Sequence, residues 1–273
     1  MKKIYQLFLL TALAALSLAG ASQAQASSKK VLKVATDSDT APFTYKKDDK
    51  FKGYDIDLIK AIFKHSNYKV TFQTVPFDTI STGIDAGKYD LAANDFNYNK
   101  ERAEKYLFSA PVSKSNYAVT GAKGKKYASL NDLSGKTTEA LSGSNYAQIL
   151  ENWNKENPNK KPITVNYVSG TTGISNRLKD IENGKIDFIL YDAISSSYIV
   201  KDQGLDLTVS PIKESLGEST DGLEYILLPK DEEGKKLQKF INRRIKVLLN
   251  DGTLLKLSKT YFGGDYVSTI NKD

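Results

Sequence analysis

The sequence contains the same ten-residue pattern twice, at residues 86–95 and 183–192, with its shared glycine and aspartates 97 positions apart. Each copy reads as a helix end, a Gly-Lys turn, an aspartate, a short apolar strand and a second aspartate, which is Asp95 or Asp192. Such turns are common between helices and strands, so chance is one explanation. The other is two lobes of related topology, each of which ends a strand at a ligand cleft.

Segments with the periodicity of strands alternate with segments of helical periodicity. Residues 31–35 and 69–73 have the pattern of strands, whereas residues 57–63 and 78–86 have apolar residues at helical spacing. This order predicts an α/β fold in which each lobe has a central, mostly parallel sheet flanked by helices. Ligands of such sheets bind at the carboxyl ends of the strands.

The first 26 residues have the features of a secretory signal peptide. Lys2 and Lys3 precede an apolar stretch, residues 7–19, and Ala24-Gln25-Ala26 provides a cleavage site. Ala21 stands where a lipoprotein would have its lipid-modified cysteine, so we expect no lipid anchor. No later apolar run approaches the roughly 20 residues of a membrane helix. The sequence therefore predicts an exported protein of the periplasm or cell surface.

Two polar, glycine-bearing stretches without periodicity, residues 121–126 and 215–222, divide the rest of the chain. We expect the chain to cross between lobes near both, and we interpret these crossovers as a hinge. Lobe 1 then comprises residues 29–119 and 220–273, and lobe 2 is an insertion of residues 120–219. Two lobes of this size agree with the usual size of domains.

Residues that carry redox and metal chemistry are almost absent. The chain has no cysteine and one histidine, His65. This argues against disulfides, thiolate metal sites, cysteine nucleophiles and Ser-His-Asp catalysis. The net charge is +7, but the lysines are scattered rather than gathered in a basic arm. We therefore expect no cofactor, no metal and no nucleic-acid partner.

Several motifs follow one another in the order typical of a known family. They resemble the polar amino-acid family of extracellular solute-binding proteins that serve ABC importers, and the resemblance covers essentially all of the chain beyond the leader. The motifs are Ala41-Pro42-Phe43, residues 53–58, residues 99–102 with 108–111, and Asp251-Gly252-Thr253 with residues 261–263.

The resemblance implies a two-lobed, hinged clamp that closes on a free amino acid and delivers it to ABC permease subunits. Residues 93–96, 101–109 and 142–146 are most similar to the cystine-binding branch, which implies L-cystine as the ligand. It also implies a monomer that is not an enzyme.

An amino acid presents a carboxylate and an ammonium, and their recognition needs a planar cation and an acid. The resemblance gives these roles to Arg102 and Asp192. From the residues alone, Arg102 at a helix start is also explained by a solvated ion pair. Asp192 is likewise explained as the N-cap of the helix that begins at Ala193. Asp37, at the end of the first strand, is the corresponding acid of lobe 1.

Ser142-Gly143-Ser144-Asn145 precedes a helix whose unpaired N–H groups suit a carboxylate, with ordinary capping as the alternative. A similar turn at residues 169–173 is interpreted as a cap only. Phe77 is expected as an apolar wall of the site or as a core residue. Thr40 stands where relatives often have a stacking aromatic, and the candidates to replace it are Phe43, Tyr45 and, from the other lobe, Tyr191. The complete set expected to bind ligand is Asp37, Thr40, Phe77, Asn94, Asp95, Asn97, Arg102, Leu141, Gly143, Ser144, Asn145, Tyr191 and Asp192.

Two other functions remain open at this point. Dehydratases that act on prephenate-like substrates share the architecture, but no residue is singled out as a general acid aimed at a leaving group. A basic, exported protein without an anchor is also suited to adhere electrostatically to an anionic envelope. Such adhesion is compatible with ligand binding.

Overall fold

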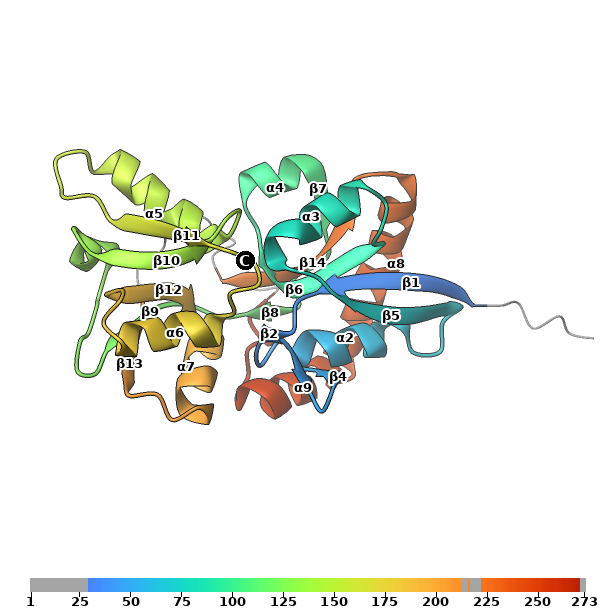
Figure 1. Ribbon diagram of the computed structural model, residues 1–273. Helices are drawn as coiled ribbons and strands as arrows, with labels where there is room; N and C mark the ends of the chain where they lie inside the picture. Colours follow the sequence, from blue (N-terminus) through green and yellow to red (C-terminus); the bar gives the residue numbers. More distant parts are fainter. Residues whose placement is uncertain (1–28, 213–215, 217–221, 271–273) are drawn as a thin grey trace, which may run out of the picture.

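The computed structural model describes residues 29–212, 216 and 222–270. The predicted leader, residues 1–26, lies outside the described residues, and so does most of the stretch 215–222. Figure 1 shows two lobes side by side, each built around one large sheet.

Lobe 1 contains a six-stranded sheet of order β5-β1-β6-β14-β7, in which β8 also pairs with β14. The strands are β1 (Lys30–Thr36), β5 (Tyr68–Thr74), β6 (Leu91–Asn97), β7 (Tyr106–Phe108), β8 (Ser113–Lys114) and β14 (Leu223–Pro229). All of them run in one direction except β14, which is antiparallel to its neighbours. A small second sheet consists of β2 (Asp39–Thr40), β3 (Thr44–Lys47) and β4 (Lys50–Lys52).

Helices cover both faces of the lobe 1 sheet (Figure 1). On one side α3 (Phe77–Asp85) packs through Ile80 and Ile84 against β1, β6 and β14. On the other side lie α2 (Tyr54–Phe63), α8 (Glu232–Asn250) and α9 (Thr253–Phe262). The short α4 (Lys100–Lys105) follows β6 and carries Arg102.

The start of α2 explains why glycine stands at position 53. Gly53 has φ of 125°, and a Cβ atom there would lie 2.1 Å from the carbonyl oxygen of Phe43. Only glycine therefore permits this close approach. The next residue, Tyr54, is fully buried and donates its hydroxyl to the carbonyl of Val112 at 2.5 Å.

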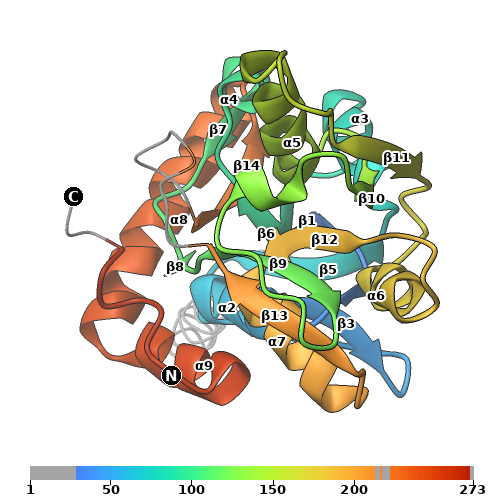
Figure 2. The ribbon, with the colours of Figure 1, turned by 90° about the vertical axis from the view of Figure 1, so that its left-hand side faces the viewer.

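Lobe 2 contains a five-stranded sheet of order β11-β10-β12-β9-β13, which faces the viewer in Figure 2. Its strands are β9 (Tyr117–Ala122), β10 (Thr137–Leu141), β11 (Thr164–Val168), β12 (Phe188–Asp192) and β13 (Leu207–Pro211). All run in one direction except β9. The 3-10 turn η1 (Leu130–Leu133) precedes β10, and the helices are α5 (Asn145–Glu156), α6 (Ile174–Glu182) and α7 (Ala193–Asp202).

The two sheets have the same topology, as the repeated pattern predicts. β6 and β12 each occupy the third place in their sheet, and the reversed strands β14 and β9 each occupy the fourth. Asp95 and Asp192 therefore lie near the carboxyl ends of equivalent strands. The prediction of an α/β fold with two related, mostly parallel sheets is confirmed.

The first crossover lies earlier in the chain than the glycine-bearing stretch suggested. β8 pairs within lobe 1 and β9 pairs within lobe 2, so the chain changes sheets at Ser115 and Asn116. Residues 121–126 instead end β9 and form a turn within lobe 2, closed by the Lys125 N–H on the Ala122 carbonyl. Two residues between β8 and β9 carry the crossing, without any glycine signal. The second change of sheet lies between Pro211 and Leu223.

Candidate functional site

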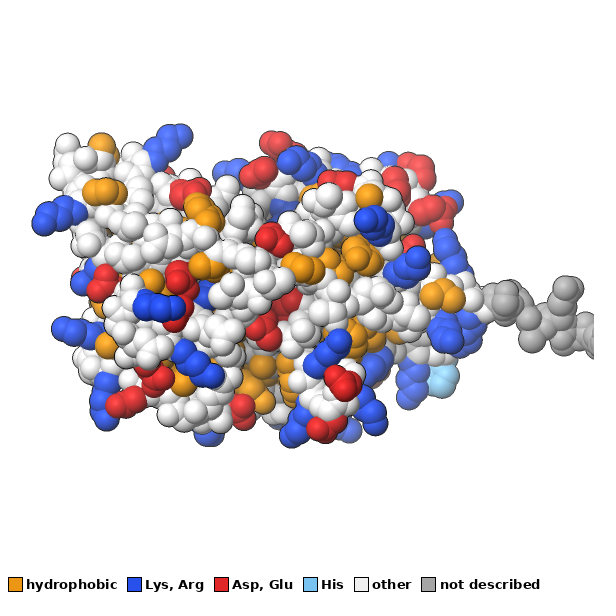
Figure 3. All heavy atoms as spheres, viewed as in Figure 1, with side chains coloured by type: hydrophobic (Ala, Val, Ile, Leu, Met, Phe, Trp, Pro, Cys, Tyr) orange, Lys and Arg blue, Asp and Glu red, His pale blue; other side chains and the backbone are white. Residues whose placement is uncertain are grey.

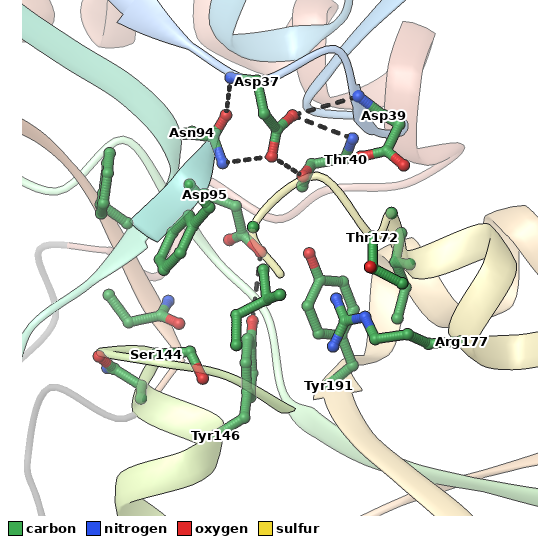
Figure 4. Close-up of a pocket in the computed structure, with 18 of the residues that line it drawn as sticks. Asp37, Asp39, Thr40, Asn94, Asp95, Ser144, Tyr146, Thr172, Arg177 and Tyr191 are labelled. Atoms are coloured by element: carbon green, nitrogen blue, oxygen red, sulfur yellow. Dashed lines mark hydrogen bonds between the residues drawn. The ribbon is translucent and has the colours of Figure 1, made fainter. Parts of the chain in front are cut away.

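A cleft between the lobes encloses about 560 Å³, part of it open to solvent. Figure 4 shows side chains of both lobes converging on it from the ends of β6 and β12 and from the start of α5 and α6. Gly143 and Asp192 are not among the residues that line it. Eleven predicted site residues do line it: Asp37, Thr40, Phe77, Asn94, Asp95, Asn97, Arg102, Leu141, Ser144, Asn145 and Tyr191.

Asp37, at the end of β1, is held in place by its neighbours (Figure 4). Its carboxylate accepts hydrogen bonds from the Thr40 hydroxyl at 2.6 Å, the Asn94 amide at 2.9 Å and the Asp39 and Thr40 N–H groups at 3.2 Å. Burial raises the pKa of Asp37, and these hydrogen bonds oppose that rise. Because its oxygens are already bonded, Asp37 orders the loop that leads to β2.

Asp95 is a buried acid of the cleft with little compensation. It lies in β6 with φ of 50°, and its carboxylate accepts one hydrogen bond, at 3.3 Å from the Tyr146 hydroxyl of lobe 2. Burial, followed by the charges of Asp192 and Asp55, raises its pKa well above the ordinary value. A cation placed against Asp95 would offset this cost, so the position suits the ammonium of a ligand.

Arg102 is buried, with 9% of its surface exposed, and lies across the junction of the lobes. Its guanidinium donates to the carbonyl of Asn97 at 2.6 Å, the carbonyl of Gly143 at 3.0 Å and the side chain of Asn145 at 3.2 Å. Burial lowers its pKa to about 10. Glu101 instead pairs with Lys105 at 3.5 Å. A solvated ion pair therefore does not describe Arg102.

Asp192 ends β12 and is the N-cap of α7, accepting the Ser195 N–H at 2.8 Å. This is the capping role that the sequence left open. Burial raises its pKa to about 6, opposed by a hydrogen bond from Ser115 and by the amides of α7. Its charge also raises the pKa of Asp95, so the two acids of the repeat interact electrostatically between the lobes.

Aromatic rings form the walls of the cleft. Phe77 stacks on Phe96 with ring centroids 5.6 Å apart and an interplanar angle of 26°. On the other side, the ring centroids of Tyr146 and Tyr191 of lobe 2 lie 4.7 Å apart. The Thr40 hydroxyl is bonded to Asp37, and Tyr191 supplies a ring close to that position, as Figure 4 shows.

Further contacts join the lobes around the cleft. The Gly170 N–H donates to the Asp78 carboxylate at 3.0 Å, and the Asn99 amide donates to the side chain of Asn145 at 2.9 Å. The Asp39 carboxylate packs so closely on Gly173 that a Cβ atom there would lie 1.2 Å from its oxygen. The structure is therefore in a closed arrangement.

The sequence analysis missed eight residues that line the cleft. Five of them lie in and after the turn interpreted as a cap only: Gly170, Thr172, Gly173, Ile174 and Arg177. The other three are Asp39, Phe96 and Tyr146. One signal was present in the sequence: Arg177 lies on the same helical face as Ile174, Leu178 and Ile181, all of which are buried. A charged residue on a buried helical face requires an explanation.

The described residues include neither a candidate metal site nor a membrane-spanning helix. No group of three or more histidine, cysteine, aspartate or glutamate residues is arranged to hold a metal ion there. Within the same residues, no helix combines the length and apolarity needed to cross a bilayer. On the face shown in Figure 3, basic and acidic side chains are interspersed over both lobes rather than gathered in one basic patch.

Comparison with known proteins assigns residues 32–264 to a described family, bacterial extracellular solute-binding proteins, family 3. The chain is 32% identical to the probable amino-acid-binding protein YxeM of Bacillus subtilis, with 97% of each chain covered. It is 28% identical to the L-cystine-binding protein TcyA of the same organism, covering 97% of this chain and 98% of that one.

Solved structures agree with this result. The chain superimposes with a TM-score of 0.80 and 35% identity on a structure from work on glutathione import via GshT and the cystine importer TcyBC of Streptococcus mutans. The match covers 87% of this chain and 97% of that one. An ancestral arginine-binding protein bound to arginine matches with a TM-score of 0.74 and 27% identity, covering 86% of this chain and 100% of that one.

Proposed function

Because the chain belongs to the bacterial extracellular solute-binding proteins of family 3, we propose that it binds a free amino acid, with L-cystine favoured, and delivers it to an ABC importer. In this role it is an exported monomer that binds its ligand without transforming it. Its partners are the amino acid and the permease subunits of the importer.

The observation that carries the proposal is the pair of opposite charges at the junction of the lobes. Arg102 is a buried, planar cation, and Asp95 is a buried acid with one long hydrogen bond. An amino acid presents the complementary pair, a carboxylate and an ammonium. We assign the carboxylate to Arg102 and the N-terminus of α5, and the ammonium to Asp95 with Asp192 behind it.

Cystine is favoured over other amino acids for two reasons. The cystine-binding protein TcyA matches over almost the whole chain, and one similar structure comes from work on a cystine importer. Arginine-binding relatives match at similar identity, so this preference depends on the sequence motifs at residues 93–96 and 142–146 as well. The stacked rings beside the cleft suit a ligand with a long, partly apolar middle.

Calorimetry tests the proposal directly. Protein that has been unfolded, dialysed and refolded to remove carried-over ligand is titrated with the twenty common amino acids, L-cystine and glutathione. We expect one site per chain and the highest affinity for L-cystine. Absence of heat and of any thermal shift with every compound would overturn amino-acid binding, whereas tight binding of another amino acid would overturn only the cystine preference.

A further inference from the structure

Arg177 is a buried cation at the cleft without a partner. It lies on α6 with 3% of its surface exposed, and its Nε is buried without a hydrogen-bond partner among the described residues. Its side chain forms no hydrogen bond and no ion pair within 4.0 Å to any residue that the structure describes. Its guanidinium lies over the ring of Tyr191, whose centroid is 5.5 Å away (Figure 4).

This contrasts with the ordinary state of a buried arginine. A guanidinium removed from water without compensating hydrogen bonds is strongly destabilising, and buried charges are almost always paired. Two acids act on Arg177 at longer range, Asp39 of lobe 1 and Glu139 of β10. Of these only Asp39 lines the cleft. The unpartnered guanidinium therefore belongs to the cleft and not to a completed internal ion pair.

The backbone beside Arg177 also suits an anion. α6 begins after Gly173, and no side chain of the described residues caps it. The uncapped N–H groups of a helix carry a partial positive charge that favours a carboxylate. Gly173, Ile174 and Arg177 all line the cleft, so the helix start and the guanidinium present positive charge to the same end of it.

Asp39 supplies an acid at this same end. It lies in β2, it packs on Gly173, and its carboxylate accepts no hydrogen bond from any described residue. Arg177 and Asp39 thus form a second pair of opposite charges in the cleft, and neither side chain is hydrogen-bonded to a described residue. The first pair of opposite charges is Arg102 with Asp95.

We infer that this end of the cleft is a second head-group subsite, in which Arg177 and the start of α6 bind a second carboxylate of the ligand and Asp39 binds a second ammonium. The ligand class is therefore an amino acid with two zwitterionic heads joined by a partly apolar linker. Cystine is the simplest such compound. This inference rests on the proposed function, because it assumes that the first head occupies the Arg102 end.

Probes that lack one distal charge test the two halves separately. L-cystine is compared with the mixed disulfide of cysteine and cysteamine, which lacks the distal carboxylate, and with that of cysteine and 3-mercaptopropionate, which lacks the distal ammonium. The chain has no cysteine, so these disulfides do not exchange with the protein. Each is titrated calorimetrically into the full mature chain and into its variants.

Removing the charge of Arg177 or Asp39 should lower the affinity only for ligands that carry the complementary distal charge. We expect Arg177→Met to weaken cystine binding about 30-fold or more, as for loss of a buried charged partner, and to change binding of the cysteamine disulfide less than about threefold. Asp39→Asn should show the reverse selectivity, with little effect on the 3-mercaptopropionate disulfide. Arg243→Met is the matched control, since Arg243 stacks on Phe240 of α8 and does not line the cleft.

A structural role for Arg177 predicts different results. If its purpose were to pair with Glu139, Glu139→Gln would weaken binding of all three disulfides as much as Arg177→Met does, and that outcome would overturn the second subsite. Equal affinity of the unaltered protein for cystine and for both truncated disulfides would overturn it too. This comparison needs no variant and remains decisive if Arg177→Met does not fold. If truncated and complete ligands all fail to bind, the proposed function fails as well.

Discussion

Arg102 and Arg177 are two buried arginines in one cleft, but the structure treats them differently. Arg102 is bonded to carbonyl and amide oxygens of both lobes, whereas Arg177 has no bonded partner among the described residues. Burial lowers the pKa of both guanidinium groups. The difference indicates that Arg102 helps to hold the lobes together in addition to binding, and that Arg177 depends on the ligand for its partner.

The neighbouring acids show the same asymmetry. Asp192 is the N-cap of α7 and is bonded there, while Asp95 has one long bond to Tyr146. A group that is already bonded is preorganised and orients what surrounds it. A group without a partner provides affinity when the ligand arrives, because binding removes the cost of its burial. The first head of the ligand should therefore meet a fixed group, Arg102, and a weakly bonded acid, Asp95. The second head should meet two groups without bonded partners among the described residues, Arg177 and Asp39.

The largest expected effect follows from removing the bonded arginine. Arg102→Ala should weaken amino-acid binding about 100-fold or more, because a ligand carboxylate loses a buried charged partner and two hydrogen bonds between the lobes are lost. Arg102→Lys should also bind poorly, since one ammonium cannot reproduce the planar fork. Calorimetry measures the affinity, and circular dichroism with thermal unfolding checks that the variants fold. If the Arg102→Lys variant bound the amino acid as tightly as the unaltered protein, the planar guanidinium would not be needed for binding.

A smaller effect concerns the pH dependence of stability and of ligand affinity, which tests the acids of the site and not the arginines. The pKa of Asp192 is about 6 in the folded protein, against an ordinary value of 3.8. The folded state therefore keeps a proton that the unfolded chain has already lost, and stability of the ligand-free protein should fall as pH rises from about 4 to about 6, by about 3 kcal/mol. Ligand affinity should rise over the same range, because the ammonium needs an ionised carboxylate.

Asp192→Asn is the variant that tests this explanation. It should flatten both slopes, measured as thermal midpoints and as calorimetric affinities between pH 4.5 and 7. Asp39, whose pKa burial also raises to about 6, contributes to the slope that remains, together with buried acids such as Asp37 and Asp95 whose pKa values are also raised. Unchanged slopes in the asparagine variant would assign the pH dependence to other groups.

The smallest expected effect concerns closure of the lobes. Gly173 has φ of −63°, which alanine adopts freely, but the added Cβ would meet the Asp39 carboxylate of the other lobe. Gly173→Ala should therefore leave each lobe intact and weaken closure, with an affinity loss of about threefold to tenfold. Small-angle scattering with saturating ligand should show a less compact particle than the parent.

The double variant Gly173→Ala with Asp39→Ala is the control for that experiment. Removing the Asp39 carboxylate makes room for the methyl group, so compaction on ligand binding should return even though the affinity stays low. If the single variant closes as fully as the parent, contact between Asp39 and Gly173 does not limit closure.

The sequence by itself determined the architecture and most of the cleft. The repeat at residues 86–95 and 183–192 predicted two lobes of one topology, because a glycine turn and a strand-ending aspartate are local features fixed by backbone geometry. Arg102 and the residues at the end of β6 were identified from motifs that stand together in the chain. Eleven of the predicted residues line the cleft for this reason.

The tertiary structure alone decided which charges have partners. Arg177 is separated from Asp39 by 138 positions, and nothing local in either segment shows that folding brings them to one end of a cleft. The first crossover at Ser115 and Asn116 was also not apparent from the sequence, because two residues between strands look the same whether those strands belong to one sheet or to two. Hydrogen-bond satisfaction and strand pairing are properties of contacts between distant residues, and a single sequence does not contain those contacts.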